Sequence, residues 1–235
     1  MRILYIYPHP DDESFGTAHA MSKQSRQGHE VYLLTLTRGG ATKQRIKFNF
    51  SIEEMGEVRY QEMLEVAKVL NLTELRVLDL PDSGLKEMDP REIEEQIKRE
   101  ITRVLPDVIA TYAVHGISGF HDHLVTHAVV KHCFVDLKGN LPGLKRLAFH
   151  TISEEEASQS QYFQLKGSTE QEIDCKMKVD QVDIHNAHKA LDCYVTFEET
   201  IKNTNIKEFI SSTVLFELYQ ENFDPPLQDL FESLP

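Results

Sequence analysis

The stretch "HPDDE" at residues 9–13 places one imidazole and three carboxylates within five consecutive positions. Three adjacent acids repel one another, so the stretch requires either exposure to water or a bound cation. His9 and Asp12 are close enough in sequence for both side chains to reach one metal ion. Catalytic zinc sites use three ligands of the His, Asp or Glu type and leave one position open for water.

A second cluster, "HGISGFHDHLVTH" at residues 115–127, contains imidazoles that could complete such a site. His121 and His123 are the candidates for the third ligand. The carboxylate that does not bind the ion, Asp11 or Glu13, could accept a proton from the water that the metal activates. The two clusters together favour a metal-dependent hydrolase.

A purely structural role for both clusters is also open. The three acids could form an exposed N-cap and first turn, where negative charge suits the helix dipole. His123, His127 and His132 could lie on the surface of one helix, since the chain contains 11 histidines. No Glu follows His123 as the zinc motif "HExxH" requires, so that class of metalloprotease is disfavoured.

Short apolar runs alternate with helical patterns along the first half of the chain, which predicts parallel strands covered by helices on both faces. The predicted strands are residues 2–7, 30–37, 76–80 and 107–114, with helices near 14–27, 53–71 and 91–105. Asp89 and Pro90 form the N-cap and first turn of the third helix. After about residue 145 the pattern loosens, with residues 146–152 and 162–165 as further strands. We therefore expect one α/β domain over residues 1–235, a Rossmann-like, mostly parallel sheet with a less regular C-terminal third.

Both clusters follow predicted strands, and this places them at a binding position. "HPDDE" comes after the strand at 2–7, and "HGISGFHDH" after the strand at 107–114. Ligands of such sheets bind beyond the carboxyl ends of the strands, so the topology can bring the clusters together.

Composition limits the other classes of function. A net charge of -13 argues against a general nucleic-acid binder, and 40% hydrophobic with 27% charged residues is typical of a globular protein. No apolar stretch is long enough to span a membrane, and the N-terminus lacks the pattern of a signal peptide. Cys133, Cys175 and Cys193 form no close pair, which fits a reducing compartment. We expect a cytoplasmic protein.

"PHPDDE" after an N-terminal strand, followed by "HGxxGxxDH", resembles the LmbE-like, PIG-L-type N-acetylglucosamine deacetylases over roughly residues 1–130. These are zinc hydrolases on a Rossmann-like fold that remove acetyl from N-acetylglucosamine joined to a second group. The resemblance implies a small-molecule conjugate as substrate, including intermediates of mycothiol, bacillithiol and GPI anchors. It implies Zn²⁺ as cofactor, although a His2Asp set also accepts iron, cobalt or nickel. Relatives often form trimers or hexamers, so it also allows a homo-oligomer.

The resemblance assigns roles residue by residue. His9, Asp12 and His123 match the metal ligands, and Asp11 matches the general base. Asp122 matches a group that orients a neighbouring imidazole.

Arg59 in "EVRYQE" and Asp82 in "PDSGL" match positions that bind sugar hydroxyls. Without the resemblance, Arg59 would be interpreted as a helix-surface charge and Asp82 as a turn residue.

The sequence departs from the family at two positions. Many relatives read "GHPDH" where this chain reads "GFHDH", so Phe120 occupies the place of a histidine that stabilises the oxyanion or protonates the amine. His121 is our candidate to replace it; His115 or another group could substitute, or the metal and Asp11 could act alone. In "CYVTF", Tyr194 stands where relatives often have His.

Three alternatives to a deacetylase remain. A dinucleotide or S-adenosylmethionine binder needs a Gly-rich turn after the first strand, and the acids stand there instead. A metal- and sugar-binding protein without catalysis would be compatible with Phe120. A hydrolase of another N-acyl small molecule would use the same ligands. Basic residues of the segment 41–52, Lys43, Arg45 and Lys47, could meet an acidic group on the substrate, such as the malate of a bacillithiol precursor.

Overall fold

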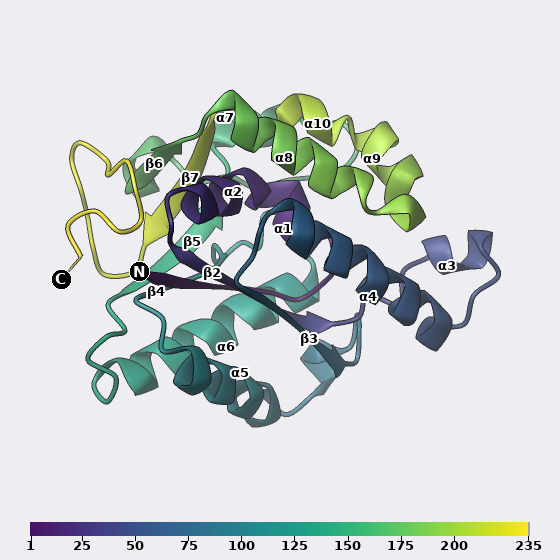
Figure 1. Cartoon of the computed structure of the whole chain (residues 1–235), viewed down its shortest axis with the longest axis horizontal. Helices are drawn as coiled ribbons and strands as arrows, with labels where there is room; N and C mark the ends of the chain where they lie inside the picture. The colour runs from purple at the N-terminus through teal and green to yellow at the C-terminus, as the bar shows by residue number, and fades with distance from the viewer. Residues whose placement is uncertain (235) are drawn as a thin grey trace.

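Seven strands form one sheet in the computed structural model, which describes residues 1–234 (Figure 1). Their order across the sheet is β3-β2-β1-β4-β5-β7-β6. The first five pair in parallel, while β7 is antiparallel to β5 and to β6. The strands are β1 Arg2–Tyr7, β2 Glu30–Thr37, β3 Glu74–Leu80, β4 Val108–Tyr112, β5 Arg146–Thr151, β6 Cys175–Lys178 and β7 Thr213–Leu218. The predicted α/β fold with a mostly parallel sheet is confirmed.

Helices cover the sheet on both faces because its central strands are apolar on both faces (Figure 1). Ile3, Tyr5 and Tyr7 of β1 pack into one core cluster and Leu4 and Ile6 into the other. The first core lies beneath α2 Ala18–Arg26, α4 Ile52–Val69 and α8 Gln181–Asp192, and the second beneath α5 Pro90–Val104 and α6 His121–Lys138.

The start of α5 illustrates how the sequence determines the position of a helix. The Asp89 side chain accepts a hydrogen bond from the Arg91 backbone N–H, and Pro90 occupies the first turn, where its missing N–H costs nothing. Ile93, Ile97 and Ile101 then recur at helical spacing and are fully buried. This helix and its cap are confirmed as predicted.

The C-terminal third differs from the prediction in its details. Residues 162–165 were predicted as a strand, but they begin within a bend and pair with no neighbouring strand. The strands β6 and β7, which extend the sheet at one edge, were not predicted. The predicted helix at 14–27 divides at Thr17 into α1 Asp12–Gly16 and α2. The shorter elements are α3 Gln44–Lys47, η1 Leu85–Glu87, α7 Glu154–Gln159, η2 Glu170–Glu172, η3 Val195–Phe197, α9 Glu198–Thr204 and α10 Ile206–Phe209.

No helix in residues 1–234 combines the length and the apolar character that crossing a bilayer requires.

Candidate metal centre and active site

The turn between β1 and α1 turns its acids inward. Asp12 is 5% exposed and Glu13 is fully buried, while the side chain of Asp11 retains 14% exposure. Asp11 adopts a left-handed conformation with φ 86° and makes no capping hydrogen bond with its side chain. The exposed N-cap is therefore excluded as an explanation of these acids. Buried carboxylates require partners of opposite charge.

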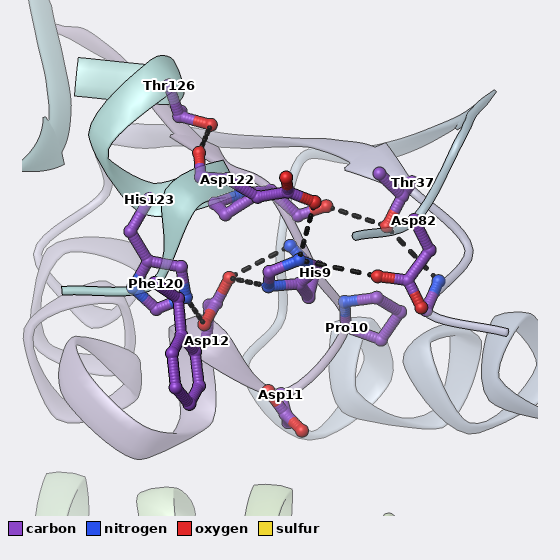
Figure 2. A network of polar contacts seen from close by, with 12 residues as sticks. His9, Pro10, Asp11, Asp12, Thr37, Asp82, Phe120, Asp122, His123 and Thr126 are labelled. Atoms are coloured by element: carbon purple, nitrogen blue, oxygen red, sulfur yellow. Dashed lines mark hydrogen bonds and ion pairs between the residues drawn. The ribbon is translucent and has the colours of Figure 1, made fainter. Parts of the chain in front are cut away.

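Two imidazoles supply these partners for Asp12 (Figure 2). His9 Nδ1 lies 3.4 Å from Asp12 Oδ2, and His123 Nε2 lies 3.3 Å from Asp12 Oδ1. The ligand atoms of these three residues all lie within 4.8 Å of one another, which suits a metal ion. His123 reaches the site because α6 begins beyond β4, the strand that pairs directly with β1.

Hydrogen bonds fix the orientation of both imidazoles. His123 Nδ1 lies 2.9 Å from the carbonyl oxygen of Gly116 and donates to it, which leaves Nε2 toward Asp12. His9 Nε2 faces Asp122 Oδ2 at 3.2 Å, which leaves Nδ1 toward Asp12. A carboxylate or carbonyl on the far ring nitrogen is the usual support of a metal-binding histidine. The contact predicted for Asp122 is present, and its partner is His9.

A second set with suitable spacing is His9, Asp82 and Asp122. Its carboxylates already have other partners. Asp122 accepts the backbone N–H groups of Ser83 and Leu85, and Asp82 accepts that of Ala41 at 2.7 Å. The set of His9, Asp12 and His123, hereafter the metal set, offers two imidazoles where the second set offers one, and it is the better match to a zinc-type site.

Charge around His9 also suits a bound cation. Burial opposes protonation of this imidazole, but the carboxylates of Asp12 and Asp122 more than offset it and raise the pKa of His9 to about 10. A divalent ion would take the place of that proton between the same carboxylates.

Asp11 lies next to this centre and is held by Arg59. Arg59 Nη2 donates to Asp11 Oδ2 at 2.7 Å and to the carbonyl oxygen of Pro10 at 2.7 Å, and Nη1 donates to that of Gly39 at 3.2 Å. The guanidinium lies 4.0 Å from the centre of the Phe197 ring. Burial raises the pKa of Asp11 more than Arg59 lowers it, to about 6. Such a value suits a general base.

Arg59 and Asp82, predicted to bind sugar hydroxyls, both line the cavity beside the metal centre. Arg59 is 2% exposed and directs its terminal donors to Asp11 and the turn. Asp82 Oδ1 lies 3.4 Å from His9 Nε2. Both side chains therefore contact the turn between β1 and α1, and their contact with a sugar stays a prediction.

His121 was predicted to replace the missing histidine, but the structure does not bring it to the site. It is exposed at the start of α6 and is absent from the cavity lining, whereas Phe120 lines the cavity with its ring against His123. A residue at the first position of a helix points outward when the next two, Asp122 and His123, turn inward. His115 does not line the cavity either.

His150 and His19 line the cavity and were missed by the sequence analysis. His150 is 4% exposed, its Nδ1 has no hydrogen-bond partner, and burial lowers the pKa of the imidazole to about 3. A signal for it existed: His150 stands at the carboxyl end of a predicted strand, where functional side chains gather.

Glu13 and Tyr194 belong to the support of the site. Tyr194 Oη donates to Glu13 Oε1 at 2.7 Å, both residues are buried, and neither lines the cavity. Glu13 is therefore excluded as the base, although burial raises its pKa to about 7.

The basic residues at 41–52 do not reach the cavity. Thr42 lines it, but Lys43, Arg45 and Lys47 do not, and Lys47 pairs with Glu199 at 2.7 Å. The suggested contact with an acidic substrate group is not supported by their placement.

The family model described as "PIG-L: GlcNAc-PI de-N-acetylase" matches residues 4–134. The chain belongs to this family. The matched residues include both clusters, the metal set and Asp11, so the predicted family is confirmed.

Curated relatives cover part of the chain. A 1D-myo-inositol 2-acetamido-2-deoxy-alpha-D-glucopyranoside deacetylase of Thermomonospora curvata is 32% identical over 54% of this chain and 50% of its own length. A mycothiol S-conjugate amidase of Streptomyces coelicolor is 31% identical over 57% of this chain and 52% of its own. The chain thus spans about half the length of these relatives.

Solved structures extend the likeness to nearly the whole chain. The zinc-inhibited form of a teicoplanin deacetylase aligns with 94% of this chain and 100% of its own, with a TM-score of 0.72 and 12% identity. At 12% identity this likeness shows the fold alone. The aligned region includes most of the C-terminal third, which the family model leaves unmatched.

The metal set makes a quantitative prediction. We expect purified protein to bind one divalent ion per chain, and His123→Ala to weaken Zn²⁺ binding at least 100-fold because it removes a ligand. Isothermal titration with Zn²⁺ measures this. His132→Ala, which alters a 59% exposed imidazole on the same helix, serves as the matched control.

The same titration has an expected dependence on pH. His9 must lose its proton to bind the ion, and its pKa of about 10 keeps that proton bound at neutral pH. Affinity should therefore rise with pH from 6 to 8, by about tenfold per unit for one released proton. A Kd that does not change over this range would contradict His9 as a ligand.

Proposed function

We propose that this chain is a divalent-metal-dependent amidase that removes the acetyl group from an N-acetylated amino sugar conjugate. The observation that carries the proposal is the convergence of His9, Asp12 and His123 around one point, with Asp11 beside them. The names of the relatives, which describe deacetylation and amide cleavage on sugar conjugates, support the same chemistry.

Zn²⁺ fits the two imidazoles and one carboxylate, and iron, cobalt or nickel fit them as well. A divalent ion held there supplies a Lewis acid that lowers the pKa of a water molecule and polarises the amide carbonyl. Asp11 lines the same cavity, where the hydrogen bond from Arg59 at 2.7 Å would hold its carboxylate for proton transfer.

Asp11 has the proton-transfer role. Its carboxylate accepts the proton of the attacking water and, as an acid, returns it to the departing nitrogen. The products are acetate and the free amine. A pKa near 6 leaves most of this carboxyl ionised at neutral pH while keeping its return of the proton feasible.

The developing oxyanion also needs a hydrogen-bond donor, which Phe120 cannot provide. We propose His150 for this role. It is a buried imidazole of the lining, and its Nδ1 has no hydrogen-bond partner. Its ring centre lies 6.2 Å from that of Tyr112, which stacks on His123 and donates to Asp12. Its depressed pKa keeps it neutral, as a hydrogen-bond donor rather than a cation.

Asp11→Asn should lower kcat at least 100-fold, because an amide cannot accept the proton, while Zn²⁺ binding persists. Acetate release from methyl N-acetyl-glucosaminide and metal content measure the two effects. Asp79→Asn, at an 83% exposed carboxylate, should leave both unchanged. Wild-type protein that binds the metal but releases no acetate from a panel of N-acetylated amino sugar conjugates would favour a non-catalytic binding protein.

Arg59→Leu should move the acidic limb of the kcat/KM profile to higher pH. Arg59 lowers the pKa of Asp11, so its removal raises that pKa, and the base is ionised only at higher pH. Profiles of acetate release against pH measure the shift. An increase in KM with the acidic limb unmoved would instead assign Arg59 to the sugar.

His150→Ala should lower kcat about 100-fold, the usual effect of losing one oxyanion donor. His121→Ala should leave kcat unchanged, since this imidazole is exposed and outside the cavity. The two variants are compared by acetate release at equal metal content. Loss of activity in His121→Ala alone would restore that residue to the mechanism.

A further inference from the structure

The lining of the cavity is polar on one side of the metal centre and mostly apolar on the other. It has a volume of about 390 Å³ and runs along the carboxyl edge of the parallel strands. Beyond β2 and β3 it is lined by Thr42, Asp82 and Ser83, which offer hydroxyl and carboxylate groups. The metal set follows at β1 and β4. Figure 2 shows Asp82 and Phe120 on opposite sides of His9.

The opposite side of the cavity is apolar. Its wall comes from the loop before α6, the chain after α7, α10 and β7, and includes Phe120, Tyr162, Phe163, Phe209, Ile210 and Leu215. Rings in this wall touch one another: the ring centre of Phe163 lies 6.0 Å from that of Phe120 and 4.7 Å from that of Tyr162.

Exposed aromatic side chains concentrate at this wall. Within residues 1–234, five Phe or Tyr side chains are exposed, and four of them line this cavity: Phe120, Tyr162, Phe163 and Phe209. Their exposed fractions lie between 36% and 50%. Such a collection of apolar surface at one opening indicates a binding surface rather than chance exposure.

Away from the metal set, the charge of the lining disfavours an acidic group. Among the described residues of the lining, Arg59 is the one Lys or Arg side chain, and Asp11 pairs with it at 2.7 Å. The lining also contains the carboxylates of Asp12, Asp82 and Glu156. A phosphate or carboxylate on the substrate would meet repulsion and would lose its hydration without a partner.

An amide held at the metal centre has one substituent on its nitrogen and one on its carbonyl carbon, and each side of the cavity suits a different one. The sugar and its attached group, which the nitrogen carries, fit the side with Thr42, Asp82 and Ser83. The rest of the acyl group, which the carbonyl carbon carries, fits the apolar side. We propose that the apolar side binds the hydrocarbon chain of this acyl group, so that amino sugars N-acylated with longer chains are hydrolysed in preference to the N-acetylated ones.

The proposal rests on the proposed function and keeps its chemistry. The oxygen of water bonds to the acyl carbon, the C–N bond breaks, and the nitrogen takes the proton. The products are a medium-chain carboxylate and the free amino sugar.

The experiment compares three substrates of the metal-loaded protein by release of amine or carboxylate: methyl glycosides of N-acetyl- and N-octanoyl-glucosamine, and the octyl glycoside of N-acetylglucosamine. We expect kcat/KM for the N-octanoyl substrate to exceed that for the N-acetyl substrate at least tenfold, because the longer chain buries its methylenes. An equal or larger gain for the octyl glycoside would overturn the placement on the acyl side. Hydrolysis of the N-acetyl substrate without a gain from either octyl chain would overturn the subsite but leave the proposed function intact.

A pair of variants locates the effect. Phe209→Ser should reduce the N-octanoyl preference at least fivefold. Phe48→Ser changes the same residue type at almost the same exposure, 38% against 39%, outside the cavity, and should leave the preference unchanged. Equal effects of the two variants would contradict a specific subsite.

Binding of the product separates the subsite from catalysis. By isothermal titration we expect octanoate to bind the metal-loaded protein at least tenfold more tightly than acetate, and Phe209→Ser to remove this difference. Tighter octanoate binding that depends on Phe209, without hydrolysis of any of the three substrates, would support the subsite and contradict the proposed function. Equal binding of octanoate and acetate would overturn the subsite.

Discussion

The carboxylate of Asp12, buried between two imidazoles, is the constraint on which the rest of this site depends. A buried anion is unstable without compensation, and here the compensation comes from chain segments more than 100 residues apart in sequence. Because β1 and β4 are neighbours in the sheet, the turn after one and the helix after the other are held at a fixed separation. The sheet therefore supplies the rigidity that a metal site requires of its ligands.

Arg59 connects this centre to the rest of the fold. It extends from α4, bonds to the turn after β1 and to Gly39 after β2, and lies against Phe197 from the C-terminal third. A guanidinium with several fixed acceptors holds its neighbours in one geometry. Gly39, with φ 65°, lies so close that a Cβ there would stand 2.5 Å from Arg59 Nη1. The position of Asp11, the proposed base, thus depends on elements from both parts of the chain.

The residues of the proposed reaction and those of the proposed acyl-chain selectivity come from different parts of the chain. The metal set, Asp11 and Arg59 all lie within residues 4–134, the part that matches the family. Much of the apolar wall lies after it, in the chain that follows α7 and in α10 and β7. The strands β7 and β6 continue the sheet past β5, and this extension places the wall beside the metal centre rather than on a remote surface.

The sequence by itself determined much of the first half. Unbroken apolar runs gave β1, β2 and β4 with correct types, the Asp89–Pro90 cap gave the start of α5, and the motif at residues 9–13 pointed to a cation. These features are local: periodicity and capping act over a few residues, so they can be read in order along the chain.

Tertiary structure decided what depends on contacts between distant segments. Only packing shows that His121 on α6 faces solvent while His150 on β5 lines the cavity. One residue of difference rotates a side chain by about 100° along a helix and moves it to the opposite face of a strand. The partner of Arg59, the pairing of β7 with β5, and the apolar wall opposite Asp82 are all non-local in the same way. The sequence identified side chains that could perform the reaction. The fold determined which of these side chains lie together and which kind of substrate fits beside them.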